Sequence, residues 1–316
     1  MRKTTALLAA FAIVASLTAC SASNTEAGCT PALASGSASK AITATGKIDT
    51  APKVKLPTPL YTPTSERSTL IAGHGAAIGS GQPVVIDVTI INARNDEVLQ
   101  KTSYSSNGGS LITSGKSSFP AVSQGLICAQ VGSRIAVIAS PKDSHSGTAD
   151  PTNGIRKNDS FVYVMDVKQA FLAKANGALQ SPKAGEPAVV TAANGAPGIT
   201  LPTTPAPKSL QTTVLRQGSG KPLKDGHYAV VQYTGVSWTD APTVFDSTWK
   251  AGQASVLQLG AASVSPGLSK ALAGQKVGSQ VLVVIPPKLA AATDGSGSAP
   301  AGQTVVYVVD ILGIAA

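Results

Sequence analysis

The chain has 316 residues and a formal net charge of +9, from 25 Lys and Arg against 16 Asp and Glu, and its length favours two domains. Hydrophobic residues make up 43% of it and its 31 glycines follow no three-residue period, which excludes a disordered chain and a collagen-like fibre. Three Cys and three scattered His form neither a CxxC pair nor an HExxH motif, so we expect no metal site and no cofactor.

The N-terminus has the layout of a cleaved secretory signal. The basic pair Arg2-Lys3 precedes an apolar run, residues 6–16, that is too short to cross a bilayer. The run ends in Leu17-Thr18-Ala19-Cys20, which resembles a bacterial lipobox, so we expect residues 1–19 to be removed and Cys20 to be lipidated. Acyl chains on Cys20 would anchor the protein on the extracytoplasmic face of the cell membrane. The alternative is a soluble exported protein in which Cys20 has no such role.

Export also bears on the charge and on the other cysteines. The basic residues are spread along the chain without a basic run, which favours a solvated surface and no nucleic-acid partner. Cys29 and Cys128 form an even pair in an oxidising compartment, so a disulfide is favoured over a free Cys29 beside a buried Cys128. Such a bridge would close a loop of about 100 residues and contribute roughly 4.7 kcal/mol in the chain-entropy model.

Residues 20–45 are rich in Ser, Ala, Thr and Gly, which predicts a flexible tether. The rest of the chain repeats itself at an offset of about 145 residues. For example, Leu56-Pro57-Thr58 recurs as Leu201-Pro202-Thr203, and Val162-Tyr163-Val164 recurs as Val306-Tyr307-Val308. The ordered matches predict a tandem duplication, with a first copy over 46–168, a linker over 169–197 and a second copy over 198–316.

Each copy is predicted to be an α+β domain, a curled, mostly antiparallel sheet wrapped on one short helix. In the second copy, Val-rich runs bounded by Gly and Pro predict strands over 228–236, 279–285 and 304–312. A helix is expected after Ser265, which can cap it, with Pro266 at its first position.

The second copy carries a series of short motifs in a fixed order. They are Val231-Gln232-Tyr233-Thr234-Gly235, Phe245-Asp246-Ser247, Pro266-Gly267-Leu268, Ala271-Leu272-Ala273-Gly274-Gln275-Lys276-Val277-Gly278-Ser279, Ile285-Pro286-Pro287 and Val305-Val306-Tyr307-Val308-Val309-Asp310. Over roughly residues 195–314 these motifs resemble the FKBP-type peptidyl-prolyl cis-trans isomerases. The resemblance implies tandem FKBP-like domains and rotation about X–Pro bonds, whose barrier is about 18–20 kcal/mol.

The resemblance also implies a site that needs neither a nucleophile nor a metal. It assigns catalysis to Tyr233, Phe245 and Asp246. Substrate binding falls on Val264, Leu268 and Tyr307, and on the backbone N–H of Ser265, which is expected to bind the substrate carbonyl.

Three positions depart from the family pattern. Leu268 stands where the family has the Trp that floors the proline pocket, Ser255 falls on another wall aromatic, and Ala291 replaces a Tyr. These departures predict a weak site or an unusual substrate. The first copy has lost more, because Val88 faces Tyr233 in the repeat and Gln100-Lys101 face Phe245-Asp246, so it is predicted to be a degenerate, non-catalytic domain.

The sequence therefore predicts a membrane-anchored, extracytoplasmic FKBP-type isomerase that assists the folding of proline-containing exported polypeptides. The alternative is a non-catalytic, lipid-anchored FKBP-like chaperone or protein-binding scaffold. A solute-binding lipoprotein would need two α/β lobes, which the strand-rich repeat does not support. The oligomeric state is left open by the sequence.

Overall fold

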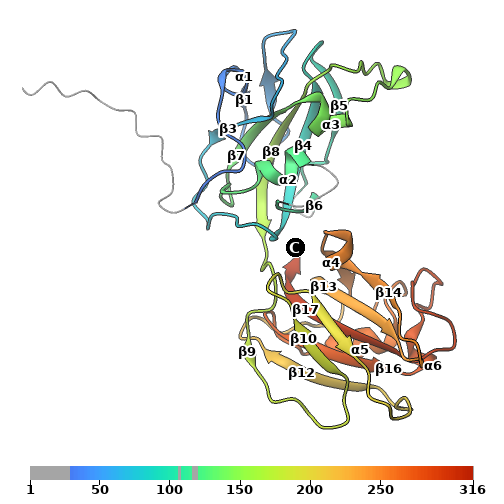
Figure 1. The fold of residues 1–316 in the computed structure, drawn as a ribbon. Helices are drawn as coiled ribbons and strands as arrows, with labels where there is room; N and C mark the ends of the chain where they lie inside the picture. Colours follow the sequence, from blue (N-terminus) through green and yellow to red (C-terminus); the bar gives the residue numbers. More distant parts are fainter. Residues whose placement is uncertain (1–28, 106–107, 116–119, 316) are drawn as a thin grey trace, which may run out of the picture.

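The computed structural model describes residues 29–105, 108–115 and 120–315, and these form two β-rich domains (Figure 1). Every strand pair within these ranges is antiparallel, which confirms the predicted mostly antiparallel sheets. The predicted signal sequence and Cys20 lie outside the described residues. No helix in the described ranges is both long enough and apolar enough to cross a bilayer.

The first domain is built on a sheet with the strand order β3-β7-β8-β4-β5, and β6 also pairs with β4. Its strands are β3 (Glu66–Ile71), β4 (Pro83–Asn92), β5 (Glu97–Lys101), β6 (Ser110–Thr113), β7 (Arg134–Ala139) and β8 (Phe161–Ala170). All residues of β7 are buried, because both faces of the sheet are covered. Helix α2 (Pro120–Gly125) packs on β7 from one side, and α3 (Pro141–His145) follows that strand.

The second domain repeats this plan with the order β14-β13-β17-β16-β12-β9, and β15 also pairs with β13. Its strands are β9 (Ala178–Leu179), β12 (Gln211–Gln217), β13 (Tyr228–Ser237), β14 (Val244–Ser247), β15 (Ser255–Gln258), β16 (Gln280–Ile285) and β17 (Val305–Ala315). The short helices are α4 (Thr248–Ala251), α5 (Pro266–Leu272) and α6 (Pro287–Ala290).

Helix α5 forms for the reasons that its sequence suggests. The Ser265 hydroxyl accepts a hydrogen bond from the Leu268 N–H at 3.3 Å, and Pro266 occupies the first turn, where no N–H is needed. Leu268, Ala271 and Leu272 are buried against the sheet. The predicted helix is therefore confirmed, and its apolar face belongs to the same core cluster as Tyr307 of the sheet.

The two sheets match residue by residue. Asp166 in β8 lies opposite Asp87 in β4, and Asp310 in β17 lies opposite Gln232 in β13, which is the same place in each sheet. Each domain also has a hairpin near its N-terminal end, β1 (Thr43–Thr45) with β2 (Lys53–Lys55) and β10 (Ala188–Thr191) with β11 (Pro197–Thr200). The hairpins supply Ala44 and Val54, and Val189 and Ile199, to the second core of each domain.

The described part of the predicted tether over 20–45 is not a free segment. It contains helix α1 (Ser37–Lys40) and strand β1, and it buries Leu33, Ala38 and Ile42 against the first domain. A disulfide between Cys29 and Cys128 joins its beginning to the loop after α2. The Ser- and Ala-rich composition suggested a tether because only a few, widely spaced apolar side chains do the packing.

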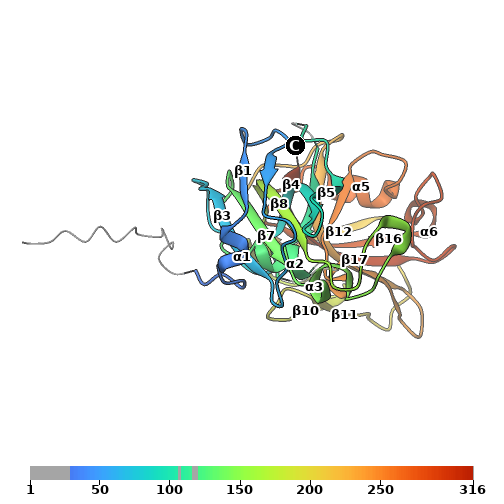
Figure 2. The same cartoon turned by 90° about the horizontal axis from the view of Figure 1, so that it is seen from above.

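The predicted linker over 169–197 also differs from the structure. Strands β9 and β10 belong to the second domain, and Phe171 is buried in a cluster with Val230, Ala254 and Leu312 of that domain. The domains are further joined by hydrogen bonds from Gln253 Nε2 to the Leu111 carbonyl at 3.1 Å and from the Ala254 N–H to Thr113 Oγ1 at 3.2 Å. They lie end to end in Figure 1, and they overlap in part when the molecule is viewed from above in Figure 2.

Candidate functional site

The candidate site lies where β13, β14 and β17 of the second domain meet. Tyr307 in β17 is opposite Gly235 in β13, and Tyr233 is two residues before Gly235, so both tyrosines lie on the same face of the sheet. Asp246 in β14 is opposite Gly235 from the other side. Antiparallel pairing thus brings the predicted Tyr233, Phe245, Asp246 and Tyr307 together.

The three aromatic rings pack edge to face. The centroids of Tyr233 and Tyr307 lie 5.8 Å apart with an interplanar angle of 70°, and those of Phe245 and Tyr307 lie 5.5 Å apart at 90°. This geometry suits the quadrupoles of aromatic rings. Tyr307 is 7% exposed and Tyr233 and Phe245 are half-buried, so the cluster has a buried base and an accessible edge.

Gly235 makes this close approach possible. A Cβ at this position would lie 2.7 Å from Phe245 Cζ and 2.8 Å from Tyr307 Cε1, which is closer than carbon atoms pack. Sequence reasoning placed Gly235 in a family motif but gave it no role in the site. The signal was the glycine in the middle of a Val-rich strand, where it marks a close approach by other groups.

Two hydroxyl groups hold the Asp246 carboxylate. The Tyr233 hydroxyl donates to Oδ2 at 2.7 Å, and the Ser298 hydroxyl donates to the same oxygen at 2.8 Å. No described residue donates to Oδ1, which leaves that oxygen available to a substrate. Sequence reasoning missed Ser298, because it comes from a loop 52 residues away and only the fold brings it to Asp246.

The tyrosines of the site remain protonated at neutral pH. Burial raises the pKa of Tyr233 above its usual value, and the hydrogen bond to Asp246 raises it further. Burial, with a smaller effect of the Asp246 charge, also raises the pKa of Tyr307. The Tyr233 hydroxyl therefore acts as a hydrogen-bond donor to the carboxylate and not as an acid.

The apolar base of the site comes from the segment that enters α5. Val264 and Leu268 are each 6% exposed and belong to the same core cluster as Tyr307. The Ser265 side chain caps α5, whereas its backbone N–H has no hydrogen-bond partner among the described residues. That amide is a donor that a substrate carbonyl can satisfy.

Two further positions depart from the family pattern. Ser255 is a half-buried residue of β15 opposite Val231, and Ala291 is an exposed residue that follows α6. Neither side chain adds an aromatic wall. Among the described residues, no three His, Cys, Asp or Glu side chains gather where they could hold a metal ion.

The first domain lacks this constellation. Val88 occupies the position of Tyr233, and Ile90, opposite Tyr163, occupies the position of Gly235. The register of β4 with β5 places Gln100 at the position of Asp246, so the predicted alignment of Gln100-Lys101 with Phe245-Asp246 is shifted by one residue. The residue at the Phe245 position is then Leu99, which packs on the core. The aromatic pair and the carboxylate are both missing.

Comparison with known proteins fits this geometry. Residues 220–312 match the family model described as FKBP-type peptidyl-prolyl cis-trans isomerase. A probable FK506-binding protein from Corynebacterium glutamicum is 34% identical over 116 residues, which cover 37% of this chain and 96% of that protein. An FK506-binding protein from Neisseria meningitidis serogroup B is 30% identical, covering 31% of this chain and 89% of that protein.

Two further matches involve proteins that are longer than the two FK506-binding proteins above. The FKBP-type peptidyl-prolyl cis-trans isomerase FkpA from Aeromonas hydrophila is 35% identical over 105 residues, which are 33% of this chain and 38% of that protein. A crystal structure of the three FKBP domains of wheat FKBP73 is 18% identical with a TM-score of 0.36, covering 79% of this chain and 94% of that one.

Proposed function

This chain belongs to the FKBP-type peptidyl-prolyl cis-trans isomerase family, and we propose that its second domain isomerises X–Pro bonds of exported polypeptides from a lipid-anchored position outside the cytoplasm. The observation that carries the catalytic part is the Asp246 carboxylate, which the Tyr233 hydroxyl holds beside an aromatic cluster. On the same proposal, the first domain is a degenerate FKBP-like copy that does not catalyse the reaction.

The reaction is a rotation about the X–Pro peptide bond, so the site accelerates it through the environment that it gives the amide and not through covalent chemistry. We place the proline ring against Phe245, Tyr307 and Leu268, where water is stripped from the amide. Removing water disfavours the charge-separated resonance form that makes the bond stiff, and this lowers a barrier of about 18–20 kcal/mol.

Two polar groups then favour the twisted amide. The free backbone N–H of Ser265 donates to the substrate carbonyl and fixes its position. The open Oδ1 of Asp246 faces the amide dipole as it turns, while the hydrogen bonds on Oδ2 keep the carboxylate in place. Because Leu268 replaces the Trp of the family pattern, the proline is held less tightly and we expect a high KM.

The location is supported by the sequence and by the cysteines. The layout of residues 1–20 is that of a lipoprotein signal, with Cys20 as the lipidated residue. The Cys29–Cys128 disulfide is of the kind that persists in oxidising compartments. Mass spectrometry of the native N-terminus tests the anchor, because an unlipidated Cys20 would contradict it.

The activity is tested by NMR exchange between the cis and trans forms of short Xaa-Pro peptides. Wild type should accelerate the exchange, and Asp246→Ala should lower the acceleration at least about tenfold. Asp225→Ala, an exposed carboxylate in a turn of the same domain, is the matched control and should leave it unchanged. Exchange at the uncatalysed rate for every peptide would support the alternative, a non-catalytic chaperone or scaffold that retains the fold.

A further inference from the structure

A cavity of about 970 Å³ lies in the first domain, between the segment after Cys29 and the strand β3. Its volume is at the upper end of the range for ligand pockets in proteins. Apolar side chains of Leu33, Ile42 and Leu70 line it together with the hydroxyls of Ser39 and Ser68. It is separate from the Asp246 site, which lies in the other domain.

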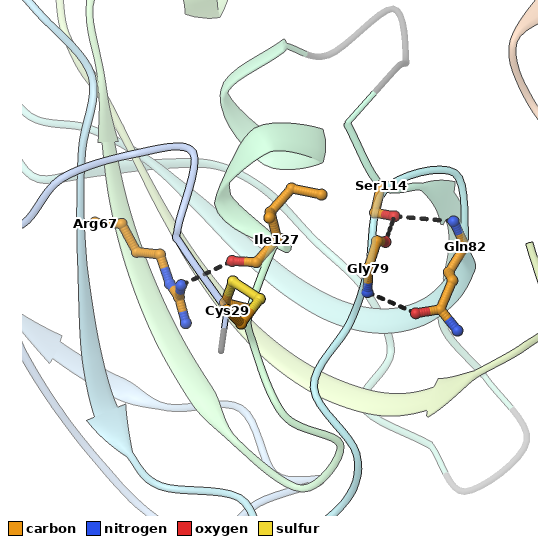
Figure 3. Close-up of a disulfide and its surroundings, with 7 residues drawn as sticks. Cys29, Arg67, Gly79, Gln82, Ser114 and Ile127 are labelled. Carbon is orange, nitrogen blue, oxygen red and sulfur yellow. Dashed lines mark hydrogen bonds between the residues drawn. A yellow bond between two sulfur atoms is a disulfide. The ribbon is translucent and has the colours of Figure 1, made fainter. Parts of the chain in front are cut away.

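The cavity contains a buried cation that has no counter-ion in the part of the chain that the structure describes. Arg67 is 8% exposed, and no described carboxylate forms an ion pair with it. Its Nη1 donates to the Ile127 carbonyl at 2.9 Å, and its Nε is buried with no hydrogen-bond partner among the described residues. Figure 3 shows the guanidinium next to the Cys29–Cys128 disulfide. An uncompensated charge in such a place is costly, and an anion in the cavity would remove that cost.

The other groups around the cavity also favour a negatively charged ligand. None of the residues that line it is Asp or Glu, whereas Lys40 and His74 contribute to its rim. The Ser133 hydroxyl also lines it and is buried without a hydrogen-bond partner among the described residues. The walls thus offer charge and hydrogen bonds to an anion, with apolar surface beside them.

The comparison of the two copies shows that the shared fold does not require this arginine. Arg67 lies opposite Val137, and the equivalent position of the second domain, opposite Val283, is Thr212. Strand β3 pairs with β7 in the first domain, and β12 pairs with β16 in the same antiparallel way in the second domain, where no cation stands at this position. The charge is therefore a property of the first copy alone.

We propose that this cavity is a carboxylate-binding site for polypeptides, with the Arg67 guanidinium as its anchor. A planar guanidinium pairs with a carboxylate through two parallel hydrogen bonds, and the apolar walls suit the neighbouring side chains of a peptide. The choice of a polypeptide rests on the proposed function of the second domain. The first domain then holds an acidic side chain or a C-terminal carboxylate of a client while the second domain acts on its prolines.

The test uses the full chain in its oxidised form and a proline-free peptide with a fluorescent N-terminal label. Four versions carry Glu or Gln at one position and a carboxylate or a carboxamide at the C-terminus. Fluorescence anisotropy should show that at least one carboxylate version binds about tenfold or more tightly than the doubly neutral version. Comparison of the versions tells whether the side chain or the C-terminus is recognised.

Variants separate this site from the rest of the molecule. Arg67→Gln should abolish the preference for the carboxylate, and Arg67→Lys, which keeps the charge but loses the fork, should retain only part of it. The exposed Arg156→Gln is the matched control and should keep it. Asp246→Ala should also keep it, so loss of isomerase activity and loss of binding are distinguished. Thermal melting establishes that both Arg67 variants fold.

Several results would overturn the proposal. They are equal binding of all four peptides, no binding of any peptide, and a preference that survives in both Arg67 variants. Displacement of the peptide by inorganic phosphate or by phosphatidylglycerol vesicles, but not by acetate, would instead assign the cavity to a phosphate or a lipid headgroup.

Discussion

Gly235 is the position where a single methyl group should do most damage to the proposed site. In Gly235→Ala the new Cβ would lie 2.7 Å from Phe245 Cζ and 2.8 Å from Tyr307 Cε1. Tyr307 is buried in the core and cannot retreat, whereas Phe245 is half-buried and can. We therefore expect Phe245 to be displaced, and Asp246, the next residue, to move with it.

The magnitude follows from two contributions. Overpacking of a buried site costs about 1–3 kcal/mol, and loss of the edge-to-face contact between Phe245 and Tyr307 costs a further 0.5–1.5 kcal/mol, roughly. A displacement of about 1 Å at a reacting group can lower the rate by about 100-fold. Gly235→Ala should thus destabilise the second domain by about 1.5–4.5 kcal/mol and lower kcat/KM by about 10- to 100-fold.

The assay combines urea denaturation with NMR exchange on an Xaa-Pro peptide. The matched control is Gly198→Ala in β11, where a Cβ meets only the Val190 carbonyl oxygen at 3.6 Å, an ordinary contact. The double variant Gly235→Ala/Phe245→Leu should recover part of the stability but not the activity, because the smaller side chain relieves the overlap. If Gly235→Ala matched wild type in both stability and activity, the close ring contact would not be the reason for this glycine.

Three further predictions concern single groups. Ser298→Ala removes one of two donors to Asp246 and should lower kcat/KM by up to about tenfold with little change in stability, whereas Ser296→Ala in the same loop should have no effect on the rate. An unchanged rate in Ser298→Ala would show that Tyr233 alone suffices. Cys29→Ser/Cys128→Ser opens a loop with a sequence separation of 99 and should lower the stability of the first domain by about 4.7 kcal/mol, measured by urea denaturation, while isomerase activity at 25 °C persists. If this double variant lost its isomerase activity, the activity of the second domain would depend on a stable first domain. Burial raises the pKa of Tyr163 to about 12, so its contribution to stability is full below pH 10 and is lost as the pH rises through 12. Tyr163→Phe should remove part of that alkaline loss, and an identical pH profile in both proteins would refute the assignment.

Local sequence patterns predicted several strands and one helix of the fold. Strand runs rich in Val and bounded by Gly and Pro predicted β13, β16 and β17 within a few residues, because their composition suits a sheet that is covered on both faces. The cap at Ser265 and the proline after it predicted α5 from side chains that act within one turn. Both kinds of signal depend on neighbours in sequence, so they can be recognised without the fold.

Segments of low hydrophobicity were predicted less well. Residues 20–45 and 169–197 were expected to be a tether and a linker, yet Ile42, Phe171 and Ala175 are buried and the hairpins cover the outer faces of the sheets. Each segment contributes few apolar residues, and their burial depends on a surface that distant strands supply. Composition alone cannot reveal such a surface.

The sequence by itself predicted a duplication, antiparallel strands in each copy, and the aromatic and acidic residues that stand at the family positions of the second copy. These properties follow from the spacing and the types of residues along the chain. The tertiary structure alone decided that Ser298 reaches Asp246, that Gly235 admits two rings, and that Arg67 is buried without a counter-ion among the described residues. Each of these depends on contacts between residues far apart in the chain, and such contacts arise only when the sheet is assembled.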